Sequence, residues 1–143
     1  MRKLVIISNK LRVGFVLAAA LLVMAARPSI STKGSVYIEN SLPTSEVTAR
    51  CQSKDDDIGR HDIAVGDSIF WSFRNNPGWS ETLFWCDLNA TDYGVLSFDA
   101  YIGKKAKIYN YHYFWFVEES GVYVQNQYGI VETLPTMSWG KLD

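Results

Sequence analysis

The chain has 143 residues, the length of one domain, and its 7 Phe, 8 Tyr and 5 Trp supply bulky side chains for a core. This composition excludes collagen-like and disordered chains. The formal net charge of −1 hides an asymmetry, because the first 26 residues carry four of the 14 basic residues and none of the 15 acidic ones. Without them the net charge is near −5, which is unfavourable for a phosphate backbone, so we expect no nucleic-acid partner.

The N-terminal segment has the order of a secretory signal peptide. Four basic residues in positions 1–12 are followed by an uncharged apolar run of 14 residues, Val13–Ala26. This order predicts a signal peptide over residues 1–26, cleaved after Ala25 or Ala26, and one mature domain over residues 32–143. The run is too short for a transmembrane helix, which needs about 20 apolar residues. We therefore expect a secreted, extracellular protein without membrane insertion after cleavage; a retained membrane anchor is the alternative.

Two features fit a secreted chain. Cys51 and Cys86 are the only cysteines, and an even number in an oxidising compartment predicts a disulfide. It would close a loop of 36 residues, stabilise the fold by about 4 kcal/mol and cross-link the two halves of the scaffold. Two buried free thiols are the alternative. The sequon Asn89-Ala90-Thr91 predicts a glycan on an exposed Asn89.

Beyond residue 30, short runs of alternating apolar and polar residues predict strands, and no amphipathic helix is evident. Turn-forming residues separate these runs, and their spacing predicts an all-β fold, a small antiparallel β-sandwich of about seven or eight strands. The run at 111–117 is nearly all aromatic or apolar, which predicts a strand covered on both faces. The expected strands lie at residues 36–42, 47–51, 69–73, 83–88, 96–102, 111–117 and 122–124, with a last short one at 130–134.

Five segments, in order, resemble the plant self-incompatibility protein family, the secreted S-protein homologues. They are VYIENSL with its Asn-x-Leu ending, CQSKDDDIGRH, GDSIFWSF, TLFWC and WFVEESGVY, which begin at residues 36, 51, 66, 82 and 115. The resemblance implies a secreted β-sandwich ligand that binds a plant cell-surface receptor or membrane protein; in the best understood case such a protein signals the rejection of self pollen. Many members carry a second cysteine pair just before a tryptophan that corresponds to Trp115, and residues 109–114 of this chain contain no cysteine. The C-terminal strands would then depend on aromatic packing.

The acidic triplet Asp55, Asp56 and Asp57 invites a calcium interpretation, but consecutive aspartates do not have EF-hand spacing. We expect a solvated turn in which Asp side chains accept from backbone N–H groups and Gly59 has a positive φ. A calcium site that borrows oxygens from other loops is the alternative. Two cysteines and two histidines form no recognisable zinc set, so we expect no metal and no cofactor.

His61 and His112 could act as the acid and base of a ribonuclease. An acidic chain without a third catalytic group argues against this, so we expect no enzyme and no catalytic residues. The structural interpretation makes His61 a strand-edge residue that bonds back to the acidic turn. It makes His112 part of a cross-strand aromatic ladder.

The tryptophans raise a further alternative, a cell-wall carbohydrate-binding module. Trp71, Trp85 and Trp115 lie in strand patterns and are expected in the core, whereas Trp79 and Trp139 could be exposed. The favoured function remains that of an extracellular ligand in cell–cell recognition or signalling. Its recognition residues are expected on loops, at Ser53–His61, which holds the acidic triplet and His61, at Asn75–Glu81, which holds Trp79, and at Asp87–Tyr93.

Overall fold

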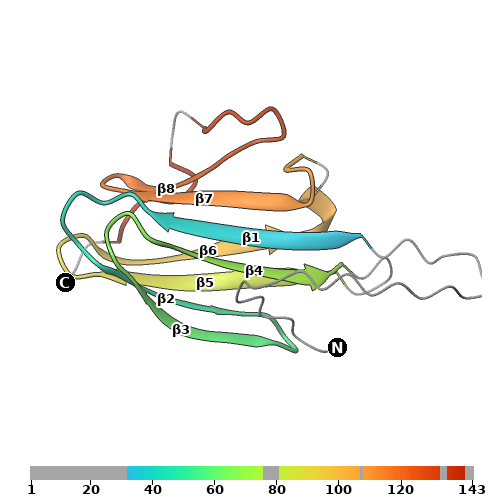
Figure 1. The fold of residues 1–143 in the computed structure, drawn as a ribbon, viewed down its shortest axis with the longest axis horizontal. Coiled ribbons are helices and arrows are strands. Elements are labelled where there is room, and N and C mark those ends of the chain that lie inside the picture. The colour runs from blue at the N-terminus through green and yellow to red at the C-terminus, as the bar shows by residue number, and fades with distance from the viewer. Residues whose placement is uncertain (1–31, 76–80, 107, 133–134, 141–143) are drawn as a thin grey trace, which may run out of the picture.

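The computed structural model describes residues 32–75, 81–106, 108–132 and 135–140, which form eight strands and one short 3-10 helix (Figure 1). Within these ranges no helix is long and apolar enough to cross a membrane. The elements are β1 (Lys33–Asn40), β2 (Val47–Gln52), β3 (Asp57–Ile63), β4 (Ser68–Arg74), β5 (Leu83–Ala90), β6 (Gly94–Ile102), η1 (Gly103–Lys105), β7 (His112–Glu118) and β8 (Gly121–Val124).

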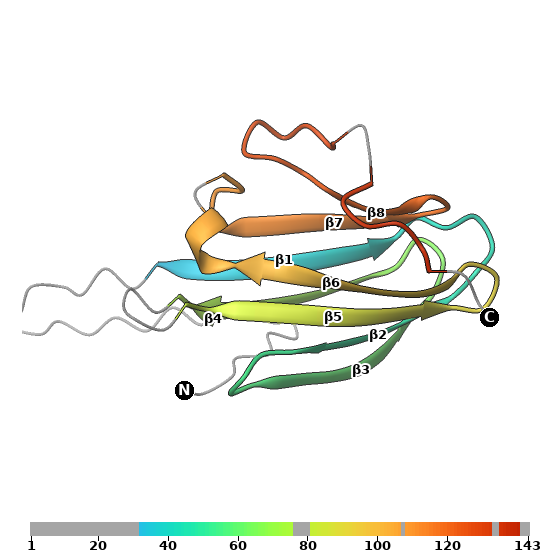
Figure 2. The ribbon, with the colours of Figure 1, turned by 180° about the vertical axis from the view of Figure 1, so that it is seen from behind.

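The strands form two sheets packed as a sandwich, which confirms the predicted fold class. Sheet A has the order β4-β1-β7-β8 and sheet B the order β3-β2-β5-β6. Figures 1 and 2 show the two layers offset sideways, so that β2 and β3 protrude at one edge and β7 and β8 at the other. Five of the six strand pairs are antiparallel, and β1 and β7 run parallel, with Ile38 opposite Trp115. The parallel pair is possible because the long excursion through sheet B separates β1 from β7.

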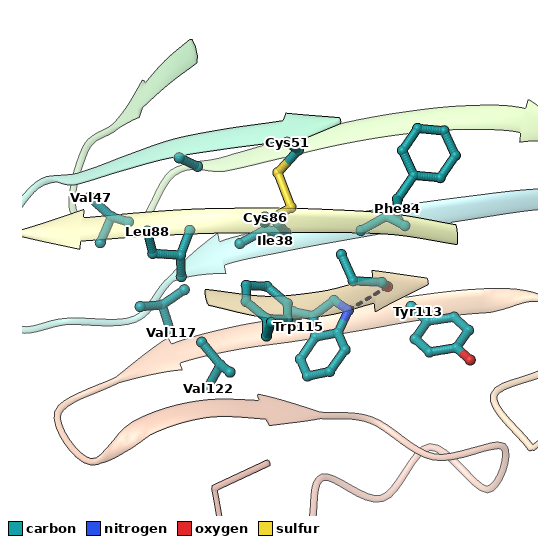
Figure 3. Close-up of a cluster of buried hydrophobic side chains, with 14 of the residues drawn as sticks. Ile38, Val47, Cys51, Phe84, Cys86, Leu88, Tyr113, Trp115, Val117 and Val122 are labelled. Atoms are coloured by element: carbon teal, nitrogen blue, oxygen red, sulfur yellow. Dashed lines mark hydrogen bonds between the residues drawn. A yellow bond between two sulfur atoms is a disulfide. The ribbon is translucent and has the colours of Figure 1, made fainter. Parts of the chain in front are cut away.

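The core lies between the inner faces of the two sheets, as the alternating pattern predicts. Val36 and Ile38 of β1 are fully buried, and they face inward while Tyr37 between them faces out. Burial of each such side chain is worth about 1.5–3 kcal/mol. Figure 3 shows the cluster in which Ile38 meets its counterparts from sheet B. Those counterparts include Val47, Ala49, Phe84, Leu88, Leu96 and Phe98.

A buried asparagine fixes the point where the chain leaves sheet A for sheet B. Asn40 is fully buried, and its amide donates to the carbonyl oxygens of Ser45 at 2.8 Å and Ile63 at 2.9 Å. Its side-chain oxygen accepts from the backbone N–H of Leu42 at 3.0 Å, so the amide group is satisfied at both ends. This gives the Asn-x-Leu signature a structural role, because no apolar residue could make these three bonds.

The predicted strands differ from the structure at two places, one strand that was missed and one that is absent. The strand β3 was not predicted, because its sequence DIGRHDI shows no apolar alternation and only Ile63 is buried. Its position at the edge of sheet B explains this, since an edge strand with charged side chains resists pairing with other chains. The expected strand at 130–134 is wrong in its described part, where a single bridge joins Val131 to Gln125; residues 133 and 134 lie outside the described ranges.

The expectation that residues 111–117 are covered on both faces is also wrong. Tyr113, Trp115 and Val117 are buried, whereas His112 is exposed and Phe114 has an exposed fraction of 40%. Only the inner face of β7 meets sheet B. The outer aromatic residues of β7 therefore lie on the surface of the sandwich.

The predicted disulfide is confirmed, with Cys51 and Cys86 bonded and both fully buried. The two residues lie directly opposite each other on β2 and β5, which are neighbours within sheet B. The expectation that this bond cross-links the two halves of the scaffold is therefore wrong. Contact between the layers depends on apolar packing and on side-chain bonds from β7 to β6, of which the Tyr113 hydroxyl to the Ile102 carbonyl, at 3.1 Å, is one.

The C-terminal segment closes one side of the sandwich. Met137 bridges to Val122 of β8, and Gly140 bridges to Val95 of β6, so the segment joins the edge of sheet A to the edge of sheet B. Between these bridges the Trp139 indole donates to the Glu118 carbonyl at 2.9 Å. Backbone bonds and one tryptophan thus secure this segment, which has no cysteine.

Candidate recognition surface

A cleft of about 300 Å³ opens at one end of the sandwich, where the β2–β3 turn meets the end of β4 and the start of β5. We call it the end cleft. Its walls are apolar. The ring centroids of Phe73 and Phe84 lie 4.5 Å apart, and Leu83 has an exposed fraction of 38%. Its rim is charged. The lining residues are Ser53, Lys54, Asp55, Asp56, Phe73, Arg74, Glu81, Thr82, Leu83, Phe84 and Trp85.

The β2–β3 turn is held in shape by short-range hydrogen bonds. The Ser53 backbone N–H donates to the Asp56 carbonyl at 2.7 Å, and the Asp56 backbone N–H donates to the Ser53 hydroxyl at 3.0 Å. The Asp57 carboxylate accepts from the Gly59 backbone N–H at 2.8 Å, and Gly59 has a φ of +88°. This agrees with the bonding expected for the acidic turn. The turn is shorter than expected, however, because β3 already begins at Asp57.

The three aspartates have different surroundings. Asp55 and Asp56 line the end cleft, whereas Asp57 lies beyond it and pairs with Arg50 at 3.8 Å. Glu81, at the opposite rim, pairs with the Lys104 ammonium at 3.3 Å and accepts from the Lys104 backbone N–H at 2.8 Å. Exposed pairs of this kind contribute at most about 1 kcal/mol to stability, so their charges stay available to a partner.

The two histidines are not brought together. His61 is exposed on β3 of sheet B, and its Nε2 lies 3.0 Å from the Ile58 carbonyl oxygen. His112 is exposed on β7 of sheet A, and its Nδ1 lies 2.7 Å from the Ser35 hydroxyl oxygen. The structure confirms the interpretation of His61 as a strand-edge residue, whereas the expected loop Ser53–His61 is wrong from Asp57 onward, because those residues belong to β3. Two histidines on different sheets do not form the acid–base pair that a ribonuclease needs.

The third predicted loop lies at the other end of the molecule and is shorter than expected. Residues 87–90 belong to β5, and only 91–93 form a turn. The Asp92 carboxylate accepts from the Ser45 hydroxyl, and the Tyr93 hydroxyl donates to the Glu119 carboxylate at 3.1 Å. Desolvation and the neighbouring Glu119 raise the pKa of Tyr93. This turn is thus fixed to the scaffold and separate from the end cleft.

Asn89 is exposed on the outer face of sheet B, where it is paired with Thr48 of β2 and Val95 of β6. An outward side chain at this position leaves room for a glycan, and glycosylation of Asn89 stays a prediction.

The tryptophans follow the expected pattern only in part. Trp71 and Trp115 are buried in the core, and Trp85 is half-buried and lines the end cleft. Trp139 is half-buried against Tyr93, with ring centroids 6.0 Å apart, so it is not a fully exposed side chain. Trp79 lies outside the described residues.

No group of three or more His, Cys, Asp or Glu side chains gathers as a metal site in the described part of the chain. The residues that sequence reasoning missed are those of the cleft wall, Phe73, Leu83 and Trp85. Their alternating pattern assigned them to strands and hence to the core, and no signal in the sequence marks a strand end that stays uncovered.

Comparison with known proteins places these features in a family context. The family model described as plant self-incompatibility protein S1 matches residues 35–139, which includes all eight strands except the first two residues of β1. The chain is similar to S-protein homolog 21 of Arabidopsis thaliana, with 32% identity over 64% of this chain and 72% of the relative. S-protein homolog 29 of the same plant is 30% identical over 67% of this chain and 70% of the relative. No solved structure matches.

Proposed function

Because this chain belongs to the plant self-incompatibility protein S1 family, we propose that it is a secreted ligand, bound outside the cell by a plant cell-surface protein. The single observation that carries this proposal is the end cleft, an apolar hollow with a charged rim on a rigid scaffold. Cell–cell recognition or signalling is the role, and rejection of self pollen is one process that such recognition would serve.

The chemistry of the end cleft favours a protein partner. Lys54 and Arg74 contribute positive charge to its rim, and Asp55, Asp56 and Glu81 contribute negative charge. Protein interfaces place an apolar anchor in a desolvated centre and surround it with polar contacts that fix its orientation. The walls from Phe73 and Leu83 suit an aliphatic or aromatic anchor of a partner. Rim charges of both signs would give selectivity more than affinity.

Export is supported by two independent features. The basic and apolar N-terminal segment has the order of a signal peptide. The buried disulfide between Cys51 and Cys86 belongs to a class of bond that persists in oxidising compartments and is rare in the cytosol.

Site-specific photo-cross-linking tests the proposal. A benzophenone amino acid at Leu83 places the probe in the cleft wall, and the same residue at Val95, exposed by 51% on β6, is the matched control. With plant plasma membranes, the probe at Leu83 should capture one membrane protein, and excess unlabelled wild type should prevent the capture. The proposal is wrong if the folded, disulfide-bonded Leu83 probe yields no competed product, or if the Val95 probe captures the same protein equally well.

A further inference from the structure

The outer face of sheet A carries five aromatic side chains, of which Phe70 and Phe114 are exposed and the other three, Tyr37, Phe116 and Tyr123, are half-buried. Tyr37 of β1 lies opposite Phe70 of β4 and opposite Phe114 of β7, which makes a row of three rings across three strands. Phe70 is exposed by 58% and Phe114 by 40%, and the ring centroids of Tyr37 and Phe114 are 5.8 Å apart. The next row adds Phe116 and Tyr123, which are paired on β7 and β8. We call these five residues the aromatic face.

The outer face of sheet B has the opposite character. There Arg50 lies opposite both Arg60 and Asp87, and Asp62 pairs with Arg60 at 3.5 Å. The sequon residue Asn89 is on this face too. The outer face of sheet B is therefore charged and solvated, whereas the outer face of sheet A has an apolar patch of the kind that marks an interaction site.

Charges flank the aromatic face with opposite signs at its two ends. Lys33 lies opposite Arg74 at the end where β1 begins, and both are exposed. Glu39 lies at the other end of β1, two residues beyond Tyr37 and opposite Phe116, and Glu118 ends β7 two residues beyond Phe116. Within the described residues neither Lys33 nor Arg74 has an ion-pair partner. The rise of a strand separates Lys33 from Glu39 by roughly 20 Å.

We propose that the aromatic face binds a second copy of this chain. A two-fold axis that lies in the interface and crosses the strands near Tyr37 would reverse the strand direction of the partner. Lys33 of one copy would then meet Glu39 of the other, and the same contact would repeat on the far side of the axis. The aromatic rows of the two copies would meet in the middle. This inference is independent of the proposed receptor, since it concerns the side of the sandwich and not the end cleft, although Arg74 is close to both.

The size of the face sets the strength of the dimer. Four strands about 4.8 Å apart and about 20 Å long present roughly 400 Å², and a stable interface buries about 800 Å² on each partner. The face is about half that size, so we expect a weak and reversible dimer. Because two ion-pair contacts orient it, added salt should weaken the association.

A charge-exchange experiment tests the dimer. The mature, disulfide-bonded protein is examined by sedimentation velocity from about 10 to about 500 μM, because a weak dimer forms only at high protein concentration. The wild type should dimerise with increasing concentration. Lys33→Glu alone and Glu39→Lys alone should associate at least about tenfold more weakly, because each places like charges in contact twice. An equimolar mixture of the two should dimerise again, because every contact then joins opposite charges. Arg60→Glu, on sheet B, should leave the association unchanged.

Three outcomes would overturn the dimer. One is a wild type that stays monomeric over the whole range. Another is association that neither single variant weakens, or that the mixture does not restore. The third is a monomeric wild type whose tyrosine fluorescence responds to soluble cell-wall oligosaccharides and loses this response in Phe70→Ser, which would assign the aromatic face to a glycan.

Discussion

The indole N–H of Trp115, in sheet A, donates to the carbonyl oxygen of Ala100, in sheet B, at 2.9 Å (Figure 3). Ala100 is the residue left without a partner where the β5–β6 register shifts, between the pairs Phe84–Tyr101 and Trp85–Asp99. A bulge of this kind frees backbone groups from the ladder. The bond therefore satisfies a buried carbonyl and joins the two layers, which the disulfide does not do.

Trp115→Phe should lower the free energy of unfolding by about 3 kcal/mol. The change removes the donor, leaves the Ala100 carbonyl buried without its partner and opens a small cavity. Urea unfolding followed by circular dichroism measures the loss. Trp85→Phe is the matched control and should cost about 1 kcal/mol or less, because Trp85 is only half-buried. Equal losses in the two variants would show that the bond between the layers contributes nothing.

Replacing both Cys51 and Cys86 by Ala should lower the free energy of unfolding by about 4 kcal/mol, since the unfolded chain loses the constraint of a 36-residue loop. Equilibrium denaturation of the double variant beside the oxidised wild type checks this value. Because both sulfurs are fully buried, mild reductant without denaturant should leave the wild-type bond intact. A loss below about 1 kcal/mol would contradict the role assigned to the bond.

Gly121→Ala should detach the C-terminal segment from β8. Gly121 has a φ of +142°, and an added Cβ would overlap the carbonyl oxygen of Met137. Hydrogen exchange at Val122 and Gly140, whose amides bond across this closure, should become faster. Gly66→Ala separates overlap from backbone strain, because Gly66 has a φ of +80° with open space around it, so it should cost only about 1–2 kcal/mol. Unchanged exchange in Gly121→Ala would refute the closure.

Stability should fall at alkaline pH. Burial, with a smaller contribution from the nearby Tyr111, raises the pKa of Tyr101 from 10.0 to about 12, and burial also raises the pKa of Tyr113. A raised pKa favours the neutral phenol in the folded state, so its contribution is complete below pH 10 and is lost as the pH rises towards 12.

Tyr101→Phe isolates this effect. The Tyr101 hydroxyl is buried and has no hydrogen-bond partner among the described residues, so the variant should be at least as stable as wild type at pH 7. Denaturation curves at several pH values between 9 and 12 should show a shallower decline for the variant. An identical decline would mean that Tyr101 does not titrate with the fold.

The alternation of apolar residues was enough to predict most strands, because strands such as β2 and β6 bury one face and expose the other. It failed for β3, where the sideways offset of the layers leaves most of an edge strand without a partner sheet. It failed differently for β7, where aromatic residues on both faces suggested burial on both. Composition cannot distinguish a covered aromatic face from an exposed one.

Only part of the candidate site could be predicted from the sequence. The turn at Ser53–Asp56 was predictable from its Asp-rich composition, and its bonding agrees with that expectation. The end cleft was not predictable, because it depends on which strand ends meet in space and on how far the layers are offset. Arg74 and Leu83 became candidates only through that arrangement.

Competition for binding sites on intact plant cells tests the central claim most directly. The competitors are unlabelled wild type, the cleft-rim exchange Lys54→Glu with Asp55→Lys, and the β3 exchange Arg60→Glu with Asp62→Lys; both exchanges keep the net charge. Wild type and the β3 variant should displace the labelled protein equally, and the cleft-rim variant should need at least about tenfold more protein. A cleft-rim variant that competes as well as wild type would contradict recognition through the end cleft.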